Sequence, residues 1–121
     1  MSQRLRRVNE QVREVLAEAV LDLKDPRLGF LTLTEVRTSP DLRSSEVYYT
    51  ALPDDEESLA GTAAGLASAT SALRRILGAR LRLRYVPDLE FIRDPVPGMG
   101  RRIEELLREG PSDGAAAAGE R

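Results

Sequence analysis

The side chains best suited to chemistry in this sequence are arginines, and five of them lie close together. Residues 74–84 contain no acidic residue and include Arg74, Arg75, Arg80, Arg82 and Arg84. Arginine binds phosphate through its planar fork of N–H donors and also stacks on nucleobases. A stripe of arginines can neutralise several nucleic-acid phosphates and release their counterions. We predict that this stretch is the main RNA-binding surface, although a solvated helix face would explain such a run about equally well.

A second group of arginines stands near the N-terminus, where Arg4, Arg6 and Arg7 are further candidate RNA contacts. Glu10 and Glu14 stand at helical spacing from these arginines, so surface ion pairs explain the cluster better than RNA binding does, by roughly two to one. Aromatic side chains that can stack on bases are Tyr48, Tyr49 and Tyr85, but packing in the core or on a sheet explains each of them at least as well. The net charge of -2 gives no hint of nucleic-acid binding, so the position of the arginines carries the prediction.

The residues needed for most enzyme chemistry are missing. The chain has no Cys and no His, which excludes disulfides, thiolate zinc sites, Ser–His triads and histidine-bound metals. The acidic pairs Asp54-Asp55 and Glu104-Glu105 are better explained by helix capping and solvation than by acid–base catalysis. Pro97-Gly-Met-Gly100 matches no phosphate-binding fingerprint. We therefore predict that the protein is not an enzyme and has no cofactor, metal or small-molecule substrate.

The hydrophobic pattern gives no sign of a membrane partner. No apolar run approaches the length that spans a bilayer, and no apolar stretch follows the basic N-terminus as in a signal peptide. The length of 121 residues fits one domain with a tail. We expect a cytoplasmic monomer with a domain over residues 1–109 and a disordered tail over residues 110–121, since the tail lacks large apolar side chains.

Apolar spacing predicts the elements that must position these arginines. Residues 4–23 have the three- and four-residue spacing of an amphipathic helix, which Pro26 ends. Residues 30–37 and 43–52 alternate in part and flank a turn at residues 38–41, as in a β-hairpin. Residues 88–93 are predicted to form a third strand and residues 99–107 a short last helix.

Between the hairpin and the third strand, residues 56–81 have helical periodicity with a weak point in the middle. Asp54 or Asp55 can cap the start of this segment. Ala69, Thr70 and Ser71 form the weak point, because Thr and Ser are poorer helix formers. We predict a helix, a kink and a second helix, with the first turning Leu59, Ala63, Leu66 and Ala67 inward. The order α-β-β-α-α-β indicates an α+β fold with a three-stranded sheet and helices on one face.

Several short motifs occur in an order and spacing typical of one bacterial family. They are Lys24-Asp-Pro-Arg-Leu-Gly29, Ser39-Pro-Asp-Leu42, the stretch from Leu77-Gly-Ala-Arg-Leu-Arg through Leu-Arg-Tyr-Val-Pro-Asp-Leu-Glu-Phe91, Asp94, and Gly100-Arg-Arg-Ile103. Over about residues 3–108 the chain resembles ribosome-binding factor A, a small-subunit maturation factor. The resemblance implies a type II KH-like fold in which an Ala-x-Gly kink replaces the usual Gly-x-x-Gly loop. The matching positions are Ala69, Thr70 and Ser71, with Ser71 in place of the glycine.

The resemblance also implies a function. Family members bind free or immature 30S subunits, contact 16S rRNA, support late maturation and processing of the 16S 5′ end, and matter for growth in the cold. Two other functions stay open. One is a KH-like domain for another RNA, such as messenger RNA, and the other is an adaptor whose arginine face meets an acidic protein.

Overall fold

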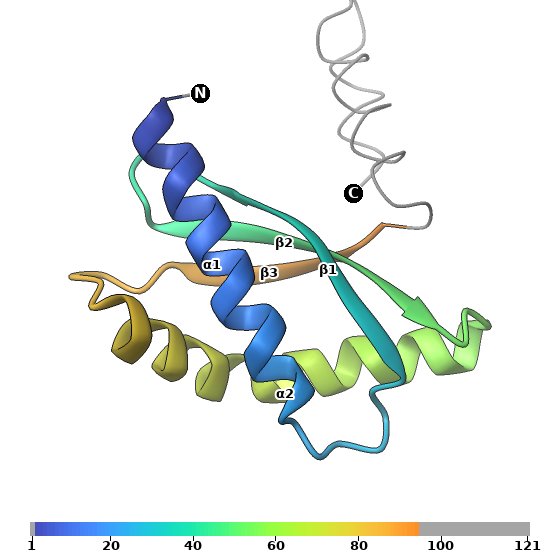
Figure 1. The fold of residues 1–121 in the computed structure, drawn as a ribbon. Coiled ribbons are helices and arrows are strands. Elements are labelled where there is room, and N and C mark those ends of the chain that lie inside the picture. Colours follow the sequence, from blue (N-terminus) through green and yellow to red (C-terminus); the bar gives the residue numbers. More distant parts are fainter. Residues whose placement is uncertain (1, 95–121) are drawn as a thin grey trace, which may run out of the picture.

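The computed structural model describes residues 2–94 as two helices and three strands. In chain order these are α1 (Gln3–Leu21), β1 (Phe30–Thr38), β2 (Ser44–Leu52), α2 (Glu56–Leu81) and β3 (Asp88–Arg93) (Figure 1). The predicted α+β class, hairpin and third strand are confirmed. The predicted helix at residues 99–107 and the tail at 110–121 lie outside the described residues.

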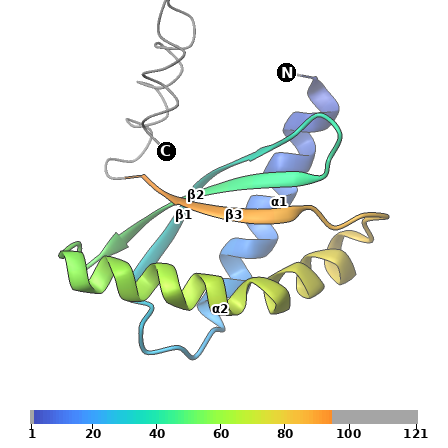
Figure 2. The same ribbon diagram turned by 180° about the vertical axis from the view of Figure 1, so that it is seen from behind.

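The three strands form one sheet with β2 in the centre. β1 and β2 pair antiparallel, as a hairpin must, whereas β3 pairs parallel to β2. A parallel pair needs a long crossover, and α2 supplies it by running lengthwise beneath the strands (Figure 2). This path returns the chain to the N-terminal end of α1, so the segment after α2 lies near the start of the protein.

One face of the sheet and both helices enclose a single core. Alternate residues of β2, Val47, Tyr49 and Ala51, are buried in it, as the period of a strand requires. The helices contribute Val12, Val15, Leu16, Ala19 and Val20 from α1, and Leu66, Leu73 and Leu77 from α2. Burying a leucine of this kind contributes about 2 kcal/mol, so these contacts fix how α1, α2 and the sheet lie together.

A β-bulge in β1 explains why its sequence alternates only in part. The register shifts between Leu33 and Glu35, so Val36 follows Leu33 onto the buried face. Strict alternation would turn Glu35 and Arg37 into the core. The bulge instead leaves them half-exposed, with Arg37 Nε 3.1 Å from Glu35 Oε2.

The structure gives α2 as one helix of 26 residues, so the predicted division into two separate helices is wrong. The predicted bend at Ala69, Thr70 and Ser71 stays a prediction. The Thr70 hydroxyl donates to the Leu66 carbonyl at 2.9 Å, and the Ser71 side chain is exposed. Both polar side chains therefore find hydrogen-bond partners, in the helix or in water, without interrupting the helix.

The inward face of α2 also differs in part from the prediction. Leu66 is buried as predicted, but Ala63 and Ala67 are exposed, and Thr62 and Gly65 are buried instead. The loop after α1 packs on this side of the helix. A Cβ atom at position 65 would lie 2.8 Å from Leu28 Cδ2, so glycine lets the Leu28 side chain pack this closely against α2.

Candidate nucleic-acid interface

Three segments far apart in the sequence meet at one end of the molecule. They are the first turns of α1, the β1–β2 turn and the loop between α2 and β3. Between them lies a groove of about 280 Å³, here called the arginine groove, lined by Arg4, Val8, Thr38, Asp41, Leu42, Arg82, Leu83, Arg84, Tyr85 and Pro87. It is an open surface groove with three arginines, an aromatic ring and an apolar floor.

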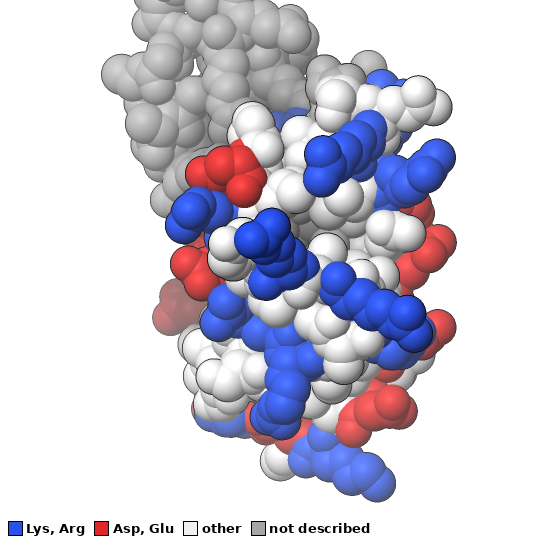
Figure 3. Space-filling view, turned by 90° about the vertical axis from the view of Figure 1, so that its left-hand side faces the viewer, with Lys and Arg blue, Asp and Glu red and all other residues white. Residues whose placement is uncertain are grey.

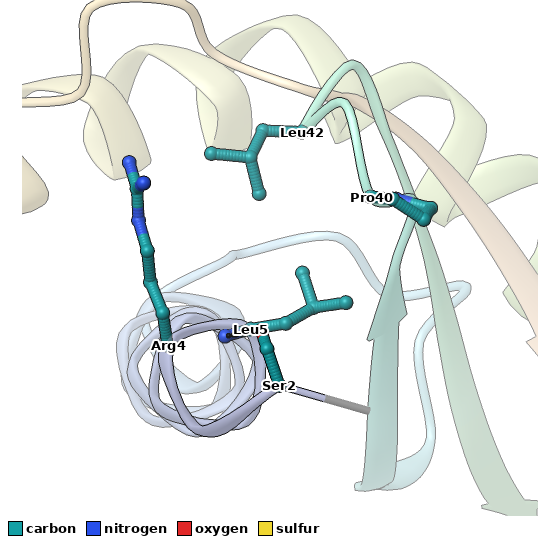
Figure 4. Close-up of a pocket in the computed structure, with 5 residues that line it drawn as sticks. All are labelled: Ser2, Arg4, Leu5, Pro40 and Leu42. Carbon is teal, nitrogen blue, oxygen red and sulfur yellow. Dashed lines mark hydrogen bonds between the residues drawn. The ribbon is translucent and has the colours of Figure 1, made fainter.

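A second hollow adjoins the arginine groove and shares two of its residues, Arg4 and Leu42. Figure 4 shows the Arg4 side chain extending away from α1, while Leu5 and Leu42 face one another across the hollow. The N-terminal turn that carries Arg4 is fixed by Ser2, whose hydroxyl accepts the Leu5 N–H at 3.0 Å.

A buried polar network holds α1 to the hairpin behind the groove. The Asn9 side-chain oxygen accepts the Thr38 N–H at 2.8 Å, and the Thr38 hydroxyl lies 2.8 Å from that of Ser45. All three residues are buried. Buried hydrogen bonds are costly to break, so this network fixes the distance between Arg4 on α1 and the β1–β2 turn.

Basic side chains dominate the face of the molecule on which the α2–β3 loop and the β1–β2 turn lie (Figure 3). The carboxylate in the groove lining is that of Asp41, and it accepts hydrogen bonds from residues of its own turn. Ser39 Oγ donates to Asp41 Oδ1 at 2.6 Å and the Arg43 N–H donates at 3.1 Å. These hydrogen bonds, that of Ser39 first, lower the pKa of Asp41. The carboxylate stays charged but is committed to the turn.

Two arginines of the 74–84 run hold the fold together. Arg74 donates from Nε to the Pro87 carbonyl at 3.1 Å and from Nη2 to the Val86 carbonyl at 2.8 Å. Arg80 Nη2 lies 3.1 Å from Glu18 Oε1 and so links the end of α2 to α1. Arg74 therefore fixes the loop on which Arg84 and Tyr85 stand.

The other predicted arginines are placed differently. Within residues 2–94, no ion pair or hydrogen bond engages the guanidinium of Arg4 or Arg82, while Arg84 lies over the Tyr85 ring at 5.6 Å from its centroid. Arg7 and Arg75 are exposed outside the groove lining. Arg6 lines a separate hollow beside β1 together with Glu10, Arg13 and Glu35, where carboxylates offset its charge.

The three candidate tyrosines are not equivalent. Tyr48 and Tyr49 are 3% and 4% exposed, and burial raises the pKa of the Tyr49 hydroxyl. Tyr85 is 66% exposed and lies in the groove. Of the three, only Tyr85 offers its ring to a base. On the sequence alone we gave the three tyrosines equal weight. The position of Tyr85 after Arg84 and shortly before Pro87 indicates an exposed loop and would have favoured it over the other two.

Backbone strain is concentrated in the same groove. Among residues 2–94, the non-glycine residues with positive φ are Leu42 at 61° and Arg82 at 52°, and both line it. The left-handed region costs a residue with a Cβ about 1–2 kcal/mol. Residues held in such conformations cluster at functional sites, which supports the groove as the functional surface.

Comparison with known proteins identifies the family of the chain. The family model described as Ribosome-binding factor A matches residues 4–107. The ribosome-binding factor A of Acidothermus cellulolyticus is 47% identical over 105 residues, which cover 86% of this chain and 69% of the relative. The chain belongs to the ribosome-binding factor A family.

Solved structures of ribosome-binding factor A share the fold. The crystal structure of the Thermus thermophilus protein is 35% identical with a TM-score of 0.66, covering 74% of this chain and 94% of that one. A Thermus thermophilus ribosome-binding factor A model fitted into a cryo-electron-microscopy map of a 30S–RbfA complex is 37% identical with a TM-score of 0.60. It covers 69% of this chain and 88% of its own.

The described part of the chain shows neither a metal cluster nor a membrane helix. Residues 2–94 contain no group of three or more Asp, Glu, His or Cys side chains placed to hold a metal ion. No helix in this range combines the length and apolar character needed to cross a membrane.

Proposed function

We propose that this protein binds free or immature 30S subunits through 16S rRNA and assists their late maturation, including processing of the 16S 5′ end. The observation that carries the proposal is membership of the ribosome-binding factor A family, one of whose members has been fitted into the map of a 30S complex. The protein acts in this proposal as a cytoplasmic, monomeric binding factor that catalyses no reaction.

The arginine groove supplies the physical means of binding. Arg4 from α1 and Arg82 and Arg84 from the segment between α2 and β3 converge on one surface. Arg7 and Arg75 are exposed elsewhere as further cations. Phosphate contacts of this kind position a protein on RNA, while the shape of the RNA supplies selectivity. Arg74 and Arg80 act indirectly, because their guanidinium groups hold the loop and the helix pair in place.

Cosedimentation across a salt series tests the binding part of the proposal. The protein is mixed with purified 30S subunits, with 50S subunits and with bulk messenger RNA. We expect comigration with 30S subunits that weakens steeply as salt rises, since released counterions drive it. Absence of such comigration would sink the proposal, and equal binding to 50S subunits or messenger RNA would favour a KH-like binder of another RNA.

Processing is tested separately in a bacterium that lacks its own family member. The ratio of precursor to mature 16S 5′ ends is measured by primer extension, at ordinary and at low temperature. We expect this protein to restore the mature end and growth in the cold. Restored 30S binding with an unchanged precursor ratio would contradict the processing role alone.

A further inference from the structure

We infer that the arginine groove takes an unpaired nucleotide of RNA, with its base stacked on Tyr85 and its flanking phosphates held by Arg4 and Arg82. This inference rests on the proposed function and deepens it, because it names the form of RNA that the surface recognises. The inference is carried by an exposed ring that shares a groove with apolar side chains and with two arginines that no other residue of the described range 2–94 engages.

The exposed aromatic ring favours single-stranded over double-stranded RNA as the ligand. In an A-form duplex the bases are stacked on one another and proteins reach mainly the 2′-hydroxyl groups and phosphates. An exposed ring gains little from such a surface. Tyr85 is 66% exposed, and stacking of a splayed-out base on a ring is the usual way in which proteins bind single strands.

The ring is held ready for stacking before RNA arrives. The hydrogen bonds from Arg74 to the carbonyls of Val86 and Pro87 fix the loop immediately after Tyr85. Arg84 lies over the ring at 5.6 Å from its centroid, which is a cation–π contact. A platform that is already ordered loses little conformational entropy on binding.

Two cations line the same groove as the ring and can hold the phosphates that flank a stacked base. Arg4 comes from α1 and Arg82 is the residue that caps the end of α2, so the two cations reach the groove from different segments. Asp41 is committed to its own turn through Ser39 and Arg43. The floor is apolar, with Val8, Leu42 and Leu83, and an acidic peptide would have no need of it or of the ring.

The absence of tryptophan from the chain permits a direct test. Tyr85→Trp places the one indole of the protein at the proposed platform, and Phe30→Trp places it at another exposed aromatic position, 83% exposed and outside the groove. A short single-stranded oligouridylate should quench the indole fluorescence of Tyr85→Trp and leave that of Phe30→Trp unchanged. The same RNA in a duplex, or a glutamate peptide, should quench neither.

The RNA affinity of Tyr85 variants that carry no added tryptophan gives a second readout. Tyr85→Ala should weaken binding of the fluorescently labelled oligouridylate about 5- to 150-fold, the range that corresponds to loss of one base–aromatic stack. Tyr85→Phe should retain most of the affinity, whereas Tyr85→Leu should lose it, because stacking needs a ring. Thermal unfolding of each variant checks that the fold persists.

The outcomes separate this inference from the function on which it rests. A Tyr85→Trp indole that single-stranded RNA does not quench, or that duplex RNA or the glutamate peptide quenches equally, overturns the inference. If the protein still cosediments with 30S subunits in that case, the proposed function stands. Loss of cosedimentation in the unaltered protein would overturn the function itself.

Discussion

Two demands on Arg82 conflict, because its side chain lines the arginine groove while its backbone lies in the left-handed region at φ 52° and ψ 43°. Glycine is the residue that usually ends a helix in this conformation. Arg82→Gly should therefore raise the free energy of unfolding by about 1 kcal/mol relative to Arg82→Ala, since only glycine removes the strain. Urea denaturation measures the difference, and equal stabilities would show that the strain is absent.

Asp25 predicts how stability depends on pH. Hydrogen bonds from the Arg27 side chain, followed by its backbone N–H, lower the pKa of Asp25 from 3.8 to about 2. A lowered pKa in the folded state gives stability that is fully present above about pH 4 and is lost as the pH falls through 2. Asp25→Asn should therefore be less stable than the unaltered protein at pH 7, by a margin that shrinks markedly by pH 3.

Denaturation of both proteins at several pH values measures that margin. Glu90→Gln, at an exposed position on β3, serves as the matched carboxylate control and should show little change at any pH. A margin for Asp25→Asn that stays constant between pH 7 and pH 3 would contradict the assignment of the low pKa to the Asp25–Arg27 pair.

At the scale of elements, α2 shows that helix propensity alone does not decide where a helix ends. Thr70 and Ser71 are weaker helix formers, yet each position costs only about 0.5 kcal/mol relative to alanine. Burial of Leu66, Leu73 and Leu77 on the same helix outweighs this cost, so the helix continues. The sequence predicted the helical periodicity correctly, and tertiary packing, which a single sequence does not display, decided the continuity.

Substitution at Ser71 tests that continuity. In a regular helix, Ser71→Ala should raise the free energy of unfolding by about 0.5 kcal/mol and Ser71→Gly should lower it by about 0.5 kcal/mol. A kink that needs glycine would reverse the order. Because Ser71 is exposed, packing changes should not obscure the result in thermal or urea unfolding. A more stable Ser71→Gly would contradict the single helix.

The strands were predictable from alternation, but the bulge in β1 was not. Phe30, Leu31, Thr32 and Leu33 alternate correctly, and the pattern then fails at Glu35. The register shift resolves the failure by keeping Val36 in the core and Glu35 out of it. A break in alternation thus signals a bulge, but its position depends on the partner strand.

At the scale of the whole molecule, the arginine groove forms because segments distant in the sequence meet at one end of the fold. The arginine run at residues 74–84 and the N-terminal arginines were both predicted as candidates from sequence alone. That Arg4 meets Arg82 and Arg84 in one groove, while Arg6 lies beside β1, follows from the parallel return of the chain to β3. Sequence spacing cannot express that proximity, nor the commitment of Arg74 to the loop carbonyls.

The arginine groove is the central claim, and the salt dependence of 30S binding tests it most directly. The double variant Arg4→Ala/Arg82→Ala removes two groove cations, and Arg6→Ala/Arg13→Ala removes two from the β1 side of α1. Cosedimentation at several salt concentrations should give a plot of log affinity against log salt whose slope falls by about 1.5 for the groove variant, since each phosphate contact contributes about 0.7–0.9. The control should keep the slope of the unaltered protein. An unchanged slope for the groove variant, or an equal loss in both, would contradict the claim.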